Sequence, residues 1–204
     1  MTTLPTFAEF ALASPLALRD GASSLNASVG LGQLSGRTLL HLRGAEAETA
    51  LQVHDMKIGD VAAVEDGLLA RLRRDEFVLL ARDGRSAFDQ LAAMIAGRRV
   101  TLTDLTHGRC GLLLVGRDAP RVLPKVCALD FRQFPDLHAA QASLAKVRTL
   151  IMRADLDALP AYGLIVDRSL AAYVWDVVFD AAREFGAAAL NDDGIDSLRK
   201  ATLW

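Results

Sequence analysis

The histidines and cysteines are the side chains best suited to hold a metal or to attack a substrate. No two of the four histidines are spaced by four residues on an expected helix, and no His-Glu-x-x-His pattern occurs. The four are His41, His54, His107 and His138. His41 lies among leucines, so we expect a partly exposed strand residue rather than a metal ligand. His54 and His107 are expected in loops. The spacing therefore predicts no metal site.

The two cysteines, Cys110 and Cys127, are too few for a disulfide scaffold or a four-cysteine zinc site, and they fit a reducing compartment. Cys110 is expected in a buried strand, where a thiol behaves as a small hydrophobe. Cys127 is expected near a loop. A nucleophilic role is not favoured for either thiol, because nothing in the sequence indicates a lowered pKa.

Glycine and acidic clusters indicate no phosphate site and no acid–base pair. Gly30-Leu31-Gly32 lacks the third glycine of a dinucleotide fingerprint, and no GxxxxGK[ST] or Gly-x-Ser-x-Gly pattern is present. The pairs Asp75-Glu76 and Asp192-Asp193 are typical of turns and helix caps. We therefore expect no catalytic, cofactor-binding or metal-binding residue in this chain.

The overall charge excludes two classes of partner. The chain has 23 basic and 25 acidic residues, a net charge of -2, so neither nucleic-acid binding nor a polybasic membrane anchor is expected. The basic runs 71–74 and 98–99 are expected to be solvated strand ends or turns. No signal peptide or transmembrane stretch is expected, which favours the cytoplasm. At 51% hydrophobic residues, the chain has either a well-filled core or an apolar surface that a partner covers.

A repeat organises the elements that must position these side chains. Gly36–Ala47 matches Gly108–Ala119, 72 residues further on. More loosely, Leu69–Arg73 matches Leu144–Arg148 and Phe77–Leu80 matches Tyr162–Val166. Each copy reads strand, short helix, strand, strand and closing helix, with the closing helices at residues 85–96 and 169–185. Ser169 is expected to be the N-cap of the second closing helix and Gly186 its stop.

Two β-α-β-β-α units in tandem predict an α+β fold with two pseudo-symmetric sheets of mixed or antiparallel pairing. Residues 1–24 are expected to form an arm, because Pro5 and Pro15 prevent one continuous helix. Residues 25–98 and 99–204 are expected to form two repeat lobes of one compact domain.

Short motifs lie along most of the chain, at Ser14–Ala17, Leu69–Phe77, Asp104–Arg109, Gly116–Ala119, Val126–Asp130, Leu144–Val147 and Arg168–Asp176. In their order and spacing they resemble the gamma subunit of heterotetrameric sarcosine oxidase. That family is itself similar to the N-terminal module of the glycine-cleavage T-protein, a folate-dependent aminomethyltransferase, and Glu184–Arg199 resembles the segment that ends this module.

Two departures from the T-protein pattern bear on function. The resemblance places an acidic pair, including the catalytic aspartate, at positions occupied here by Ala70 and Arg71. A methyl group and a cation cannot accept a proton from folate or stabilise its cationic nitrogen. The T-protein strand that reaches the pterin carries carboxylates, whereas the matching stretch here, 159–164, has none. Folate binding by this chain is therefore not expected.

The resemblance thus implies a non-catalytic structural subunit without an active site of its own. It implies alpha, beta and delta partner subunits, which carry FAD, FMN, NAD, tetrahydrofolate and zinc. The complex converts sarcosine to glycine with release of hydrogen peroxide and formation of methylene-tetrahydrofolate. The arm 1–24 and the loop 129–138 are expected to contribute to partner contacts.

Three alternatives follow from the same resemblance. The chain could be the gamma-type subunit of a related N-methyl amino acid dehydrogenase, or a free-standing tetrahydrofolate-binding protein. An iron–sulfur assembly factor of the same superfamily is disfavoured, because its Lys-Gly-Cys-x-Gly-Gln-Glu motif is absent.

Overall fold

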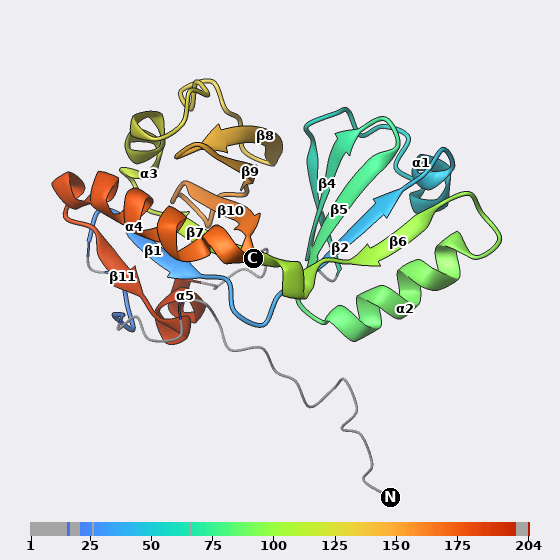
Figure 1. Ribbon diagram of the computed structural model, residues 1–204, viewed down its shortest axis with the longest axis horizontal. Helices are drawn as coiled ribbons and strands as arrows, with labels where there is room; N and C mark the ends of the chain where they lie inside the picture. Colours follow the sequence, from blue (N-terminus) through green and yellow to red (C-terminus); the bar gives the residue numbers. More distant parts are fainter. Residues whose placement is uncertain (1–15, 17–20, 26, 66, 199–203) are drawn as a thin grey trace, which may run out of the picture.

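The computed structural model describes residues 16, 21–25, 27–65, 67–198 and 204. Most of the expected arm 1–24 lies outside these residues. In the part described, the strands form two sheets, and helices cover the outer face of each (Figure 1). Every strand pairing is antiparallel except that of β1 with β11, which is parallel. The prediction of two mixed or antiparallel sheets is confirmed.

The larger sheet has six strands in the order β11-β1-β7-β10-β9-β8. Their bounds are Gly30–Gln33 for β1, Arg109–Val115 for β7, His138–Leu144 for β8, Val147–Arg153 for β9, Ala161–Asp167 for β10 and Ala188–Leu190 for β11. The smaller sheet has five strands in the order β3-β4-β5-β2-β6. Their bounds are Thr38–Arg43 for β2, Val61–Val64 for β3, Gly67–Arg73 for β4, Glu76–Ala81 for β5 and Thr101–Asp104 for β6.

The helices form the two outer layers. Short α3 (Ala119–Val122) and long α4 (Ala171–Ala182) cover the six-stranded sheet, while α1 (Ala47–Leu51) and α2 (Gly84–Ile95) cover the five-stranded sheet. A fifth helix, α5 (Asp192–Leu198), lies beside β1 at the inner side of its sheet. The inner faces of both sheets share one apolar core. The central strands β4, β5, β7 and β10 are therefore largely buried on both faces, which explains their nearly continuous apolar sequences.

The duplication is visible in the order of elements, but each copy has one strand more than expected. The first copy runs β2, α1, β3, β4, β5, α2, and the second runs β7, α3, β8, β9, β10, α4. The strands missed from the sequence are the sheet edges β3 and β8. Their sequences, VAAV and HAAQASL, are rich in alanine, which has a low strand propensity.

Strand register corrects part of the internal alignment. Phe77 pairs with Leu42 as Tyr162 pairs with Leu114, so the match of Phe77 with Tyr162 is confirmed. Phe77 also pairs with Arg71, and Tyr162 with Arg153. Arg71 is thus equivalent to Arg153.

The predicted match of Leu69–Arg73 with Leu144–Arg148 is wrong. The second segment contains the β8–β9 turn, where Ala145 and Lys146 have φ angles of 49° and 65°. Two consecutive left-handed residues are typical of a type I′ hairpin turn. A turn of this kind has no counterpart within β4, where the first segment lies.

The sheets also cut across the lobe boundary expected at residues 98 and 99. Strand β1, which precedes the first copy, adds to the six-stranded sheet beside β7. Strand β6, which follows residue 98, adds to the five-stranded sheet beside β2. The lobes 25–98 and 99–204 therefore do not coincide with the sheets, and their folding as one domain stays a prediction.

The two sheets are joined edge to edge by a single antiparallel bridge between Asp60 and His138. The N–H of Val61 donates to the carbonyl of Leu137 at 2.8 Å, and that of Ala139 donates to the carbonyl of Gly59 at 2.7 Å. One residue further along each strand, Val61 pairs with Ala70 and Ala139 pairs with Met152. Ala70 and Met152 directly precede the equivalent residues Arg71 and Arg153. Asp60 and His138 are therefore equivalent positions of the two copies, and the bridge lies on the pseudo-twofold axis.

The helix ends agree in part with the sequence. Gly186 has a φ of 68° and ends the 3₁₀ turn after α4, as predicted. Ser169 is not the N-cap, because the Asp167 carboxylate accepts the N–H of Ser169 and caps the 3₁₀ turn that leads into α4. In the described residues, no helix is long and apolar enough to cross a membrane.

Candidate functional site

The candidate site is an open cleft of about 420 Å³ between the inner faces of the two sheets. Strands β2 and β5 form one wall, and β7, β8, β9 and β10 form the other. Apolar residues line most of it, and the polar residues sit in its walls. The polar lining consists of His41, Glu76, Arg109, Gln141, Arg148 and Asp167.

On the first wall, His41 and Glu76 face each other across β2 and β5. His41 Nε2 lies 3.0 Å from Glu76 Oε1, and Arg73 Nε lies 3.3 Å from Glu76 Oε2. His41 is half-buried on its strand, as predicted. A histidine held by a carboxylate can act as a general base when a nucleophile lies beside it. The lining of this cleft contains no serine, threonine or cysteine.

On the second wall, Arg109 Nη1 donates to Asp167 Oδ2 at 2.9 Å, and Arg148 Nη2 donates to Gln141 Oε1 at 2.9 Å. Hydrogen bonds from Ser169, followed by the charge of Arg109, lower the pKa of Asp167. Both carboxylates of the cleft therefore have a cationic neighbour, Arg109 in the wall for Asp167 and Arg73 outside the lining for Glu76. Such a cleft can bind a ligand or a peptide segment, and the lowered pKa of Asp167 makes that carboxyl group unsuited to acid catalysis.

Ala70 and Arg71, where the T-protein resemblance places acids, point to opposite faces of β4. Ala70 is fully buried in the core between the sheets. Arg71, only 6% exposed, lies over the Phe77 ring at 5.3 Å. Its Nη1 donates to the Met56 carbonyl at 2.6 Å, and its Nη2 donates to Glu48 Oε2 at 2.7 Å. Arg71 therefore holds the chain around α1 in place, and the expectation that run 71–74 is a solvated strand end is wrong at this residue.

The carboxylate-free stretch 159–164 also divides between two faces. Tyr162 is buried on the outer face of β10, where Phe131 lies edge-on to it at 5.9 Å. Burial raises the pKa of Tyr162 to about 12. Ala161 packs in the core between the sheets. Gly163, also on this inner face, carries no side chain, and the space above it is filled by another part of the chain.

That occupant is the indole of Trp204, which is 1% exposed. A Cβ added to Gly163 would lie 2.3 Å from Cζ3 of the Trp204 ring. The indole Nε1–H donates to the carbonyl of Ala154 at 2.6 Å, and Arg37 Nη2 donates to the Trp204 backbone oxygen at 2.7 Å. Sequence reasoning missed Trp204. The signal was Gly163 itself, since a glycine inside a strand often marks close approach by another group.

The remaining histidines lie apart from the cleft. His54 Nδ1 is 3.8 Å from Glu48 Oε1, and His107 lies in a 3₁₀ turn between β6 and β7. His138 forms the bridge between the sheets and packs edge-on against Phe134 at 5.2 Å. Across the described residues, no three His, Cys, Asp or Glu side chains cluster closely enough to hold a metal ion.

Both cysteines are buried and free in the structure. Burial raises the pKa of the Cys110 thiol to about 11, so it is protonated near neutral pH. The expectation of Cys110 in a buried strand is confirmed by its place in β7. Its burial and raised pKa make it a poor nucleophile.

The glycine and acidic motifs lie in a strand, in a turn and in a helix, not in a binding loop. Gly30–Gly32 lies within β1 rather than in a phosphate-binding loop. Asp75 and Glu76 are at the β4–β5 turn, and Asp192 and Asp193 are in the first turn of α5. The placement of Asp75 and Glu76 agrees with the predicted turn role. The cap of α5 is instead Asn191, whose side-chain oxygen accepts the N–H of Gly194 at 2.8 Å.

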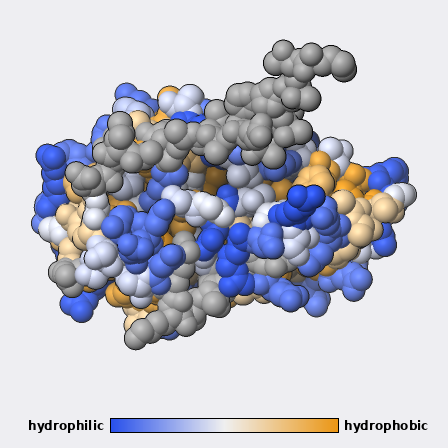
Figure 2. All heavy atoms as spheres, turned by 90° about the horizontal axis from the view of Figure 1, so that it is seen from below, coloured by the Kyte–Doolittle hydropathy of each residue, from blue (hydrophilic) through white to orange (hydrophobic). Residues whose placement is uncertain are grey.

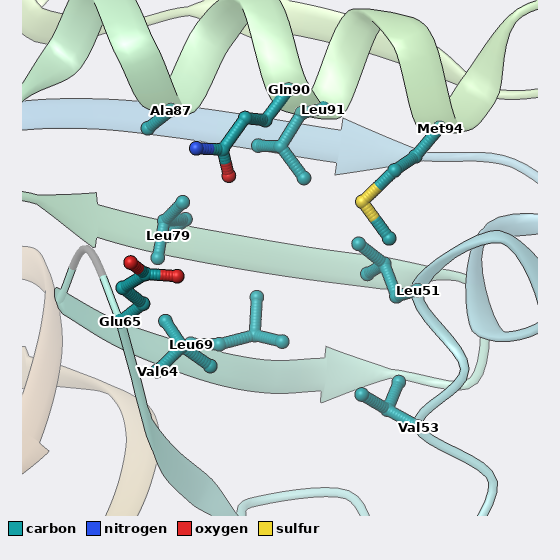
Figure 3. Close-up of a pocket in the computed structure, with 10 residues that line it drawn as sticks. All are labelled: Leu51, Val53, Val64, Glu65, Leu69, Leu79, Ala87, Gln90, Leu91 and Met94. Carbon is teal, nitrogen blue, oxygen red and sulfur yellow. The ribbon is translucent and has the colours of Figure 1, made fainter.

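A second, apolar cavity of about 190 Å³ lies between α2 and the outer face of the five-stranded sheet (Figure 3). Ala87, Leu91 and Met94 point from α2 toward Leu69 and Leu79 of the sheet. Its rim carries the polar side chains of Glu65 and Gln90. This cavity has the size and character to take a small apolar group, and it contains no reactive side chain.

The chain is similar in sequence to a known domain family and to a curated protein. The family model described as GCVT N-terminal domain matches residues 56–201. A curated relative, the sarcosine oxidase subunit gamma of an Arthrobacter species, is 33% identical over 100 residues, which make up 48% of this chain and 49% of the relative. The match spans about half the length of that relative.

Two solved structures share the fold over most of the chain. A chain of the heterotetrameric sarcosine oxidase from Corynebacterium sp. U-96, in complex with pyrrole 2-carboxylate, superposes with a TM-score of 0.73 at 26% identity, covering 86% of this chain and 97% of that chain. The glycine cleavage system aminomethyltransferase T from Bartonella henselae gives a TM-score of 0.71 at 20% identity, covering 85% of this chain and 50% of that one. The second likeness concerns the fold alone. Together the matches confirm the predicted resemblance and fold class.

Proposed function

Because the chain belongs to the GCVT N-terminal domain family, we propose that it is the gamma-type, non-catalytic subunit of a heterotetrameric sarcosine oxidase complex. The observation that carries the proposal is the likeness to a chain of that enzyme over 97% of its length. The curated gamma-subunit relative supports the same assignment. The complex would act in the cytoplasm and convert sarcosine to glycine.

The inner faces of the sheets support a scaffolding role. Ala70, Ala161 and Gly163 offer no carboxylate to accept the amino and ring N–H groups of a pterin. The Trp204 indole fills the space over Gly163. The residues present therefore do not fit a folate there.

Partner subunits named alpha, beta and delta would supply the chemistry in this proposal. They would carry FAD, FMN, NAD, tetrahydrofolate and zinc, and this chain would carry none of these groups. The loop 129–138 is one proposed contact. Phe131 and Phe134 anchor it in the core, while Leu137, near its end, is 40% exposed. An anchored loop with an exposed apolar side chain suits a protein interface.

Co-purification from the native cells tests the assignment. The tagged chain is expected to elute with partner chains that show flavin absorbance and oxidise sarcosine with release of peroxide. A chain that elutes alone in a functional cell extract would contradict the proposal. If the purified complex oxidises N-methylglutamate in preference to sarcosine, the related dehydrogenase is the correct assignment.

A free-standing tetrahydrofolate-binding protein is the remaining alternative. Calorimetric titration of the isolated chain with tetrahydrofolate separates it from the subunit assignment. We expect no saturable heat. Saturable binding at one site per chain would replace the proposal with this alternative.

A further inference from the structure

The space over Gly163 is a site with the shape of an aromatic ring. At the equivalent position of the first copy stands Val78, whose side chain fills the core between the sheets. In the second copy the glycine leaves that volume to another group, flanked by Ala154 and Ala161, both fully buried. We call the hollow formed by Ala154, Ala161 and Gly163 the ring slot.

The ring slot has one defined polar contact. The carbonyl of Ala154 accepts the N–H of the Trp204 indole at 2.6 Å, and both groups are buried. Outside the slot, the Arg37 guanidinium binds the Trp204 backbone oxygen at 2.7 Å. Within the slot, the Trp204 ring is thus held by close backbone approach at Gly163 and by one carbonyl that accepts its N–H.

We propose that the ring slot is a binding site for indole-type ligands, planar bicyclic aromatics with one N–H donor, and that Trp204 acts as its internal competitor. A pterin is a poorer match, because its several N–H donors need more acceptors than the single carbonyl of Ala154. The Trp204 indole belongs to the same chain as the slot, so it competes with any free ligand. External ligands therefore reach the slot only when Trp204 leaves it. The inference does not rest on the proposed subunit role.

The test uses the full chain and 3-methylindole, the free side chain of tryptophan, in calorimetric titrations. Trp204→Ala opens the slot and is expected to bind one 3-methylindole per chain. The wild-type chain is expected to bind about 100-fold more weakly, because its own indole occupies the slot and must be displaced. The analogue 3-methylbenzothiophene, which lacks the N–H, is expected to bind Trp204→Ala about fivefold more weakly, the equivalent of one hydrogen bond.

The matched control is Trp204→Ala combined with Gly163→Val, which gives the slot the side chain of Val78. This variant is expected to bind 3-methylindole at least about tenfold more weakly, since the added side chain occupies the slot. Equal binding by the control would place the ligand elsewhere and overturn the proposal. So would equal binding by the wild-type chain, or tetrahydropterin binding to Trp204→Ala as tightly as 3-methylindole.

A folded Trp204→Ala chain that does not bind would mean that the space collapses, and it would also overturn the proposal. Circular dichroism and a cooperative melting transition establish folding. If Trp204→Ala does not fold, Trp204→Leu retains apolar volume over Gly163 and replaces it in the titrations. It is expected to bind 3-methylindole more tightly than the wild-type chain, and absence of that difference would refute the inference.

Discussion

Replacing Arg71 tests whether a position where the T-protein resemblance places an acid now serves only the scaffold. In Arg71→Ala, the carbonyls of Met56 and Arg74 lose their buried donor, Glu48 loses its ion-pair partner, and Phe77 loses the cation above its ring. At about 1 kcal/mol for each of the two lost hydrogen bonds to backbone carbonyls and about 1 kcal/mol for the cation–π contact, we expect a loss of at least about 3 kcal/mol. Breaking a buried pair costs a similar amount.

Urea unfolding followed by circular dichroism measures this loss. With a denaturant slope of about 2 to 3 kcal/mol/M, the midpoint of Arg71→Ala should fall by about 1 M. Arg73→Ala is the matched control on the same strand, because the Arg73 side chain is 56% exposed and its ion pair with Glu76 should contribute less than about 1 kcal/mol. If both variants lower the midpoint equally, Arg71 is not the structural anchor argued here.

Three further predictions concern single side chains. The hydrogen bond from Arg71 lowers the pKa of Glu48, so the stabilisation that the Glu48–Arg71 pair gives is complete above the ordinary value of 4.5 and disappears as the pH falls through the lowered pKa. The free energy of unfolding of Glu48→Gln should therefore decline less on acidification than that of the wild-type chain. Parallel declines in the two chains would contradict the pairing. The buried Tyr162 hydroxyl has no hydrogen-bond partner among the described residues, so Tyr162→Phe should keep or raise the melting temperature, whereas a lower one would reveal a hidden partner. Gly59 has a φ of 95°, and a Cβ there would lie 2.3 Å from the His138 ring. Gly59→Ala should therefore lower the free energy of unfolding by more than about 2 kcal/mol in urea unfolding. An unchanged urea midpoint would refute the close approach of Gly59 and His138.

The repeat was predictable from sequence because its central strands keep their apolar pattern. Leu39, Leu40 and Leu42 are buried on the two faces of β2, as are Leu112 to Val115 in β7, so both copies retain a similar apolar run. The closing helices were predictable for a similar reason, since their apolar residues recur at helical spacing. The edge strands β3 and β8 were not, because an edge strand needs only one neighbour and tolerates alanine, glutamine and serine.

Strand register was the second limit. The segments Leu144–Arg148 and Leu69–Arg73 have similar amino-acid sequences. The first segment forms a turn at Ala145 and Lys146, whereas the second is part of strand β4. Side-chain similarity cannot distinguish the two, because a type I′ turn without glycine carries no local signature.

The candidate site was predictable only as an absence of acids. Ala70 and the carboxylate-free 159–164 stretch were identified from sequence, but the role of Arg71 was not, because its partners Glu48 and Met56 lie far from it in the chain. The cleft itself depends on two sheets meeting face to face, which no local pattern encodes. Trp204 was missed because its partners Gly163 and Ala154 come from a distant hairpin.

The bridge at Asp60 and His138 has the geometry of an interface between two identical chains. In a homodimer, the twofold axis would place the same residue on both sides of such a bridge, so each side chain would have to tolerate its own copy. Fusion of the two copies removes that constraint. Here a carboxylate stands opposite an imidazole, and Gly59 makes room for the His138 ring while its counterpart Leu137 projects outward. Because both copies lie in one chain, the two equivalent sheet edges can carry different side chains. The two ends of the bridge therefore differ from each other, which the ends of a symmetric homodimer bridge could not.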